Sequence, residues 1–225
     1  MYVQEYMTHD PITIAPDCDA ADALRTMIRT DVRRLPVLTG RELVGLVTRD
    51  TLYARLPNDI NPLRTSLPPD WRARLTVREF MATDLITAQP LDPIEEAAEL
   101  MRKHKIGGLP VIQRERLVGL ITESDIFRAF TQLMGAGRNG VRISLRTPAD
   151  PAQILKVLKS GSVFGVTVNN LAMCRKENQE DVVLTLRVEG RELDRYIRGL
   201  WNAGYRVTGV LHSKPAPQAE TTDAA

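Results

Sequence analysis

Two stretches of this chain decide its fold: RRLPVLTGRELVGLVTRDT at residues 33–51 and GGLPVIQRERLVGLITESD at residues 107–125. The match continues upstream without a gap, so that residues 3–51 align with residues 77–125 at a constant offset of 74 positions. Seventeen of these 49 aligned pairs are identical. A repeat of this size predicts two copies of one small supersecondary unit that pack together. The interface between two such copies is a favourable place for a ligand cavity.

Each copy has the pattern of a β-α-β-β-α unit. In the first copy, an extended run at residues 11–15 precedes a helix whose apolar positions recur at helical spacing, from Ala20 to Ile28. Residues 35–38 and 43–47 read as two strands joined by a polar turn. In the second copy, Asp92, Pro93 and Glu95 predict the N-cap, N1 and N3 positions of the corresponding helix.

The rest of the chain divides around these copies, which we place at residues 1–56 and 76–134. Residues 57–75 carry four prolines and predict a linker. Residues 135–140 read GAGRNG and match the dinucleotide-binding pattern G-x-G-x-x-G. That pattern needs a strand before it and a helix after it, whereas here a helix precedes and a strand follows, so we expect a glycine-rich linker. Residues 141–212 predict a βαββαβ, ferredoxin-like unit. Residues 213–225 predict a disordered tail.

Composition narrows the function classes. The 30 basic and 28 acidic residues give a net charge of +2, which is too mild to predict nucleic-acid binding. We expect no membrane span, because no run of about 18 apolar residues occurs. The first residues do not resemble a signal peptide, and Cys18 and Cys174 lie far apart, which is typical of free thiols in a reducing cytoplasm.

Catalytic and metal-binding patterns are not evident. His9, His104 and His212 lie in separate segments, without the spacing of a metal site. The sequence contains neither a nucleophile elbow nor a Walker motif. We therefore expect a protein that is not an enzyme and that holds no metal and no catalytic cofactor.

The duplicated unit resembles the CBS domain. The resemblance rests on landmarks present in both copies: the opening Met7 and Met81, the hydrophobic-Thr strand, the Leu-Pro-Val strand and the closing Gly-Leu-Val/Ile-Thr. Residues 141–212 resemble an ACT domain, and the whole order resembles the acetoin-utilisation AcuB type of protein. These resemblances imply an α/β (α+β) fold with a tandem CBS pair, two β-α-β-β-α repeats, followed by a ferredoxin-like βαββαβ ACT-like domain.

The CBS resemblance implies two clefts that commonly take adenine nucleotides, and we expect the second copy to supply the main site. A carboxylate at Asp125 can accept both ribose hydroxyl protons, and the basic residues 102–105 could meet phosphate. Thr122-x-x-Asp125 is also a capping-box pattern, and the two roles can share these residues. The nucleotide-binding residues that the resemblance implies are Ile86, Thr87, Ala88, Ile106, Gly107, Gly108, Pro110, Thr122 and Asp125.

The first copy departs from this pattern and predicts a weaker second cleft. Thr51 stands where the second copy has Asp125, and Asp50, one residue earlier, is expected to point about 100° away. An arginine pair replaces Gly107 and Gly108; it could bind phosphate, block the cleft or be plain surface charge. The cleft could be empty, weak or selective for another ligand. Its expected residues are Thr13, Arg33, Arg34, Pro36, Thr48 and Thr51.

The combined prediction is a non-catalytic, cytoplasmic regulatory protein that binds AMP, ADP, ATP, S-adenosylmethionine or NAD in its CBS pair. Binding would change how the CBS and ACT-like units dock, within a homodimer and with an unknown protein target. The ACT-like unit lacks the usual glycine after its first strand, so a dimerisation or docking role through its sheet is favoured over amino-acid binding. One alternative is a constitutive oligomerisation scaffold with vestigial clefts. Another is an accessory protein or enzyme of acetoin or acetate metabolism.

Overall fold

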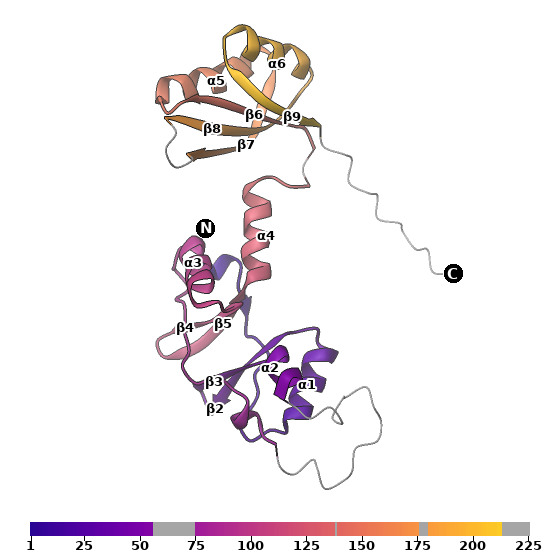
Figure 1. The fold of residues 1–225 in the computed structure, drawn as a ribbon, viewed down its shortest axis with the longest axis vertical. Helices are drawn as coiled ribbons and strands as arrows, with labels where there is room; N and C mark the ends of the chain where they lie inside the picture. The colour runs from indigo at the N-terminus through magenta and orange to yellow at the C-terminus, as the bar shows by residue number, and fades with distance from the viewer. Residues whose placement is uncertain (56–74, 138, 176–179, 213–225) are drawn as a thin grey trace, which may run out of the picture. The chain divides into compact units, whose positions relative to one another are not determined.

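The computed structural model describes residues 1–55, 75–137, 139–175 and 180–212 (Figure 1). The chain divides into two compact units, Met1–Ala129 and Phe130–Ala225. Except for Leu75, the predicted linker lies outside the described residues, as does the predicted tail. None of the helices within the described ranges has the length and apolar character that a bilayer crossing requires.

The first unit contains the two copies, each with a helix, a hairpin and a second helix. Both hairpins have the same register, with Leu35 opposite Val47 and Leu109 opposite Ile121, and both shift register after the valine of Leu-Pro-Val. The elements of the first copy are η1 (Val3–Glu5), β1 (Thr8–His9), α1 (Ala20–Arg29), β2 (Arg34–Thr39), β3 (Glu42–Thr48) and α2 (Arg49–Arg55). Those of the second are η4 (Val77–Glu79), α3 (Ile94–His104), β4 (Gly108–Gln113), β5 (Arg116–Thr122) and α4 (Glu123–Leu133).

The N-terminal segments of the two copies are exchanged. Strand β1 pairs with β5 of the second copy, where Thr8 lies opposite Leu120. Reciprocally, Ala82 bridges to Leu46 of the first copy. The apolar side chains follow the same exchange: residues 3–7 enter the core of the second copy, and residues 77–81 enter that of the first. The strand predicted at residues 11–15 is therefore wrong, because that segment makes an isolated parallel bridge and the regular pairing falls earlier, on the other copy.

Two methionine–glycine contacts explain two of the identical pairs in the repeat, Met7 with Met81 and Gly45 with Gly119. Met7 packs against Gly119, where a Cβ atom would overlap the methionine sulfur. Met81 packs against Gly45 in the same way, and a Cβ there would lie 2.5 Å from its sulfur. Each exchanged segment therefore needs a glycine on the strand that receives it.

The two copies begin their first helices differently. Asp19 caps α1, where its carboxylate accepts hydrogen bonds from the backbone N–H of Ala21 at 2.7 Å and of Asp22 at 3.2 Å. The predicted N-cap at Asp92 is wrong, because α3 begins one residue later than expected and Pro93 is its N-cap. The Asp92 carboxylate instead accepts from the backbone N–H of Gln89 at 2.7 Å, in the preceding turn.

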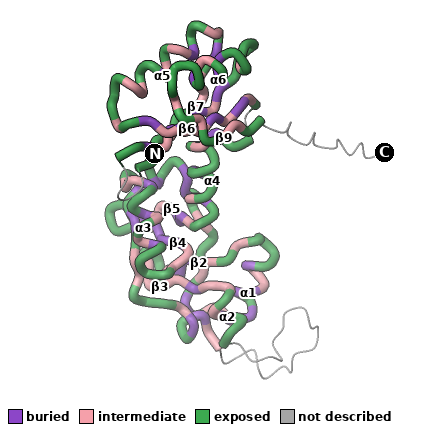
Figure 2. Tube along the Cα trace, turned by 45° about the horizontal axis from the view of Figure 1, so that its top comes forward, coloured by how far each residue is buried: buried purple, intermediate pink, exposed green. Residues whose placement is uncertain are grey.

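The second unit confirms the predicted βαββαβ order. Its four strands form an antiparallel sheet in the order β7-β8-β6-β9, and α5 and α6 lie on the same side of it (Figure 1). Buried residues alternate along β6 and β8 and meet Tyr196 of α6 in one core. Figure 2 marks the buried residues of the chain in purple. The elements are β6 (Val141–Pro148), α5 (Pro151–Val163), β7 (Val166–Arg175), β8 (Asp181–Gly190), α6 (Leu193–Asn202) and β9 (Arg206–His212).

Candidate functional site

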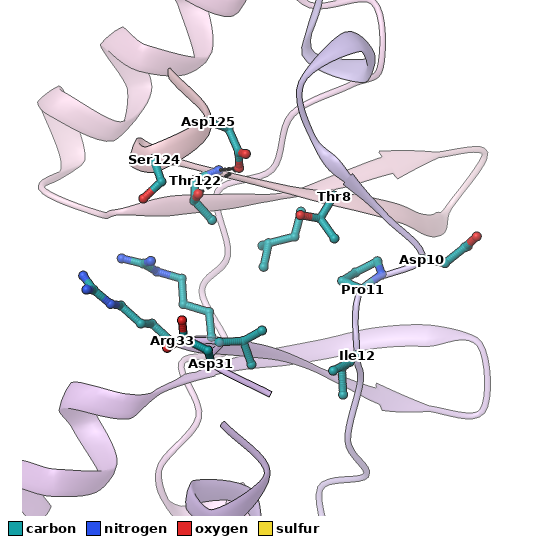
Figure 3. A pocket seen from close by; sticks show the side chains of 12 residues that line it. Thr8, Asp10, Pro11, Ile12, Asp31, Arg33, Thr122, Ser124 and Asp125 are labelled. Atoms are coloured by element: carbon teal, nitrogen blue, oxygen red, sulfur yellow. Dashed lines mark hydrogen bonds between the residues drawn. The ribbon is translucent and has the colours of Figure 1, made fainter. Parts of the chain in front are cut away.

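The first unit contains a cavity of about 420 Å³ built from both copies, which we call the Asp125 cavity. The start of α4 faces the segment that carries Asp31 and Arg33, and residues 8–12 close one side (Figure 3). Its lining residues are Thr8, Asp10, Pro11, Ile12, Asp31, Val32, Arg33, Arg34, Leu120, Thr122, Ser124 and Asp125.

A second cavity of about 490 Å³, the Thr51 cavity, has the same construction with the copies interchanged. Every lining residue of the Asp125 cavity has its counterpart, 74 positions away, in the lining of the Thr51 cavity. The two cavities are thus related by the same duplication as the sequence. The counterparts are Ala82, Asp84, Leu85, Ile86, Lys105, Ile106, Gly107, Gly108, Leu46, Thr48, Asp50 and Thr51. The remaining lining residues are Arg33, Arg34, Arg55, Phe80, Met81 and Pro110.

The structure divides the residues that the sequence grouped into one nucleotide site. Thr122 and Asp125 line the Asp125 cavity together with the arginine pair of the first copy. Ile86, Ile106, Gly107, Gly108 and Pro110 line the Thr51 cavity with Thr48 and Thr51. The predicted grouping by copy is therefore corrected: each cavity combines the end of a hairpin from one copy with the loop before the hairpin of the other.

Four predicted residues lie outside the linings of these two cavities. Thr87 is exposed and lines a separate pocket with residues 112–115. Ala88 is buried and bridges to Val111. Thr13 is exposed, and Pro36 is buried within β2. Thr8, Asp10 and Ile12 line the Asp125 cavity but were not predicted as site residues, although the identity of Asp10 and Asp84 between the copies is a signal that could have pointed to this segment.

The Asp125 carboxylate is buried, with 7% of the residue exposed, and is held by three donors. Its Oδ2 accepts from the backbone N–H of Thr122 at 2.9 Å and from the Thr122 hydroxyl at 2.8 Å. Its Oδ1 accepts from the Arg128 guanidinium at 2.9 Å, and Arg128 also donates to the carbonyl of Tyr6 in the exchanged segment. A carboxylate has about four acceptor positions, so one position on Oδ1 remains for a further donor.

The matching position in the first copy has a different network. The Thr48 and Thr51 hydroxyls lie 2.9 Å apart, and the Thr48 hydroxyl accepts from the backbone N–H of Thr51 at 3.1 Å. Asp50 lines the same cavity as Thr51, just as Ser124 lines the cavity of Asp125. Two neighbouring residues of the first turn of α2 therefore line one wide cavity, so the shift of the acid by one residue does not remove it from the cleft.

Arg33 and Arg34 line both cavities. The Arg34 side chain lies over Gly107 and Gly108, where a Cβ on Gly107 would overlap its guanidinium. Burial lowers the pKa of Arg34, while the carboxylates of Glu123 and Asp50 oppose that shift, so the group stays charged.

The two cavities differ in charge. The Asp125 cavity contains three acidic side chains, Asp10, Asp31 and Asp125, beside the shared arginines. The Thr51 cavity contains two acidic side chains and adds Lys105 and Arg55. The Arg55 guanidinium lies 5.7 Å from the centre of the Phe80 ring. Of the basic residues 102–105, Lys105 lines this cavity, whereas Arg102 is exposed and pairs with Glu99. In the described part of the chain, no three His, Cys, Asp or Glu side chains form a group that could hold a metal ion.

Two helix–hairpin–helix copies with exchanged N-terminal segments and two cavities at matching positions define a duplicated domain pair. Comparisons with known proteins give the family. The CBS domain model matches residues 3–58 and 77–132. A CBS domain-containing protein of Dictyostelium discoideum is 33% identical over 129 residues, which cover 55% of this chain and 87% of that protein. The chain therefore belongs to the CBS-domain proteins, and its first unit is a tandem CBS pair.

Two solved structures are similar to this pair. The CBS domain pair of protein MJ0100, solved in complex with 5′-methylthioadenosine and S-adenosyl-L-methionine, is 26% identical with a TM-score of 0.50, covering 59% of this chain and 97% of that one. A candidate acetoin utilization protein (AcuB) of Vibrio cholerae is 31% identical with a TM-score of 0.49, covering 60% of this chain and 93% of that one. The chain spans 46%, 34% and 24% of the length of three further curated relatives.

Proposed function

We propose that this protein is a non-catalytic regulator whose CBS pair binds an adenine nucleotide or a related adenosyl compound. The candidates are AMP, ADP, ATP, S-adenosylmethionine and NAD. The observation that carries the proposal is the buried Asp125 carboxylate, which lines a cavity and keeps one acceptor position. The MJ0100 domain pair, which was solved with two adenosyl compounds, supports this class of ligand.

The cavity suits such a ligand in size and chemistry. Its volume of about 420 Å³ falls within the range of small-molecule sites. A ribose hydroxyl can donate to Asp125 Oδ1, and a second can replace the Thr122 hydroxyl at Oδ2, because a threonine hydroxyl turns readily. The shared arginines would meet phosphate groups where the ligand has them.

The second unit and a second copy of the chain would receive the signal. Ligand binding would shift the equilibrium between two docking states of these units. The free energy of that shift cannot exceed the difference between the ligand's binding free energies for the two states. The order of a CBS pair followed by a ferredoxin-like βαββαβ unit supports an ACT-like, AcuB-like assignment. The exposed aromatic side chains Tyr53, Phe127 and Phe130 support a homodimer through the helices of the pair. We also propose a cytoplasmic location, which the free thiols of Cys18 and Cys174 support.

A thermal-shift screen with AMP, ADP, ATP, S-adenosylmethionine and NAD tests the proposal. A ligand at 100 times its dissociation constant stabilises the folded state by about 2.7 kcal/mol. In a chain of this size each kcal/mol raises the melting temperature by roughly 2–4 °C. We expect at least one compound to produce such a shift. No shift with any of them would favour a constitutive scaffold with vestigial clefts, and turnover of acetoin by the purified protein would contradict a non-catalytic role.

A further inference from the structure

Arg34 stands where the duplication is least symmetric. Its counterpart 74 positions later is Gly108, and that of Arg33 is Gly107, so the first copy carries two cations where the second carries no side chain. Both arginines line both cavities. The same pair of cations therefore lines both cavities.

Arg34 can line both cavities because the two glycines of the second copy leave space for its side chain. Its guanidinium lies against Gly107, and a Cβ on Gly108 would lie 3.2 Å from its Cδ. Side chains at positions 107 and 108 would occupy this space, so the asymmetry makes room for one long side chain between the two cavities. Arg33, in contrast, is exposed.

Two carboxylates, one from each copy, favour the charged form of the Arg34 guanidinium. Arg34 interacts electrostatically with Glu123, at the start of α4, and with Asp50, at the start of α2. Glu123 follows Thr122 of the Asp125 cavity, and Asp50 precedes Thr51 of the other. The guanidinium is thus placed between the first turns of the two helices that begin at the two cavities.

We propose that Arg34 is one anion-binding group shared by the two cavities, so that a phosphate-bearing nucleotide in one cavity lowers the affinity of the other for a second. This inference rests on the proposed function. A guanidinium binds phosphate through paired, directional hydrogen bonds, and turning toward one phosphate removes those donors from the other cavity. Two dianionic phosphates near one cation also repel each other. A nucleoside without phosphate lacks both effects.

Calorimetric titration of the full chain with AMP and, separately, with adenosine tests this sharing. We expect the ratio of the second to the first dissociation constant to be about fivefold or more larger for AMP than for adenosine, whose ratio measures the intrinsic difference between the cavities, or AMP to saturate at one molecule per chain. We expect adenosine to fill two sites without this coupling. Arg34→Gln should weaken the tighter AMP site about tenfold or more and remove the coupling. Arg34→Lys should retain part of it, because a point charge remains.

Controls separate sharing from general effects of charge or folding. Arg33→Gln removes the exposed neighbour and should reduce the coupling less than Arg34→Gln does. Arg25→Ala removes an arginine that pairs with Asp22 on the surface of α1 and should leave both titrations unchanged. The melting temperature of each variant without ligand reports its folding.

Three results would overturn the inference. Coupling between AMP sites that persists in Arg34→Gln, equal coupling for adenosine, or a single site for both compounds would each contradict a shared cation while leaving nucleotide binding intact. If neither compound binds, the proposed function fails, and the inference fails with it.

Discussion

The Asp125 and Thr51 cavities have the same backbone construction and different chemistry. Each takes a strand end and helix start from one copy and a loop from the other, at matching positions throughout. At four of these places the side chains differ in charge: Asp125 against Thr51, Ser124 against Asp50, Asp31 against Lys105, and the arginine pair against two glycines. Duplication has thus preserved the shape of the site, while substitution has changed what each cavity can bind.

The difference in charge gives the two cavities different preferences. The Asp125 cavity has a carboxylate acceptor for a ribose and an excess of acidic side chains, which favours an adenosyl group with little or no phosphate. The Thr51 cavity has two hydroxyls instead and adds Lys105 and Arg55, which favours phosphate. Substitutions at matching positions of the two copies test this contrast.

Removal of the Asp125 carboxylate should weaken adenosine binding far more than the equivalent substitution of Thr51 does. Asp125→Ala should weaken the tighter adenosine site by about 10–100-fold, because hydrogen bonds to a charged acceptor contribute about 1.5–3 kcal/mol. Thr51→Ala, at the equivalent position, should change that site by about threefold or less. Calorimetric titration measures both. Equal losses in the two variants would show that the cavities do not differ at this position.

A methyl group added to the glycine that receives each exchanged N-terminal segment should destabilise the two copies by similar amounts. Gly119→Ala and Gly45→Ala should each lower the free energy of unfolding by about 1–3 kcal/mol, because the new methyl group overlaps a methionine sulfur. Urea denaturation measures the loss. Gly209→Ala, where an added Cβ meets nothing within 4 Å, is the matched control and should cost less.

A double-mutant cycle identifies the partner of each glycine. Met7→Ala should cost less in the Gly119→Ala background than in the native protein, because it relieves the overlap. Strict additivity of the two changes would contradict the contact and, with it, this account of the exchange.

The Thr51 cavity should gain ribose affinity when it receives the missing acid. Thr51→Asp should raise the affinity of the weaker adenosine site by about tenfold, equivalent to about 1.4 kcal/mol, and make the two sites more alike. Calorimetric titration with adenosine reads this out. An unchanged weaker site would mean that the absence of the carboxylate is not what separates the cavities.

The smallest expected contrast lies in the helix caps. Asp19→Ala should lower the free energy of unfolding by about 1 kcal/mol, because its carboxylate accepts from two N–H groups at the start of α1. Asp92→Ala should cost less, since that carboxylate accepts from one exposed N–H outside the helix. Chemical denaturation of both variants checks the order, and a larger cost for Asp92→Ala would reverse it.

The sequence predicted the elements of this fold better than it predicted the grouping of the site. Hydrophobic periodicity and the offset of 74 positions predicted the helices and hairpins, and alternation predicted the four-stranded second unit. The exchange of residues 3–9 and 77–82 was not predictable, because both copies carry the same apolar pattern and either segment would suit either core. Each cavity also combines segments from both copies. Gly107 and Asp125 therefore line different cavities, although both belong to the second copy.

The central claim is that the Asp125 carboxylate accepts a hydrogen bond from the ribose of the ligand. A crystal structure of the full chain with adenosine tests this claim most directly. We expect the nucleoside in the Asp125 cavity, with a ribose hydroxyl about 2.5–3.0 Å from a carboxylate oxygen of Asp125. Adenosine bound elsewhere, or bound in this cavity with its ribose beyond hydrogen-bond distance of that carboxylate, would contradict the account.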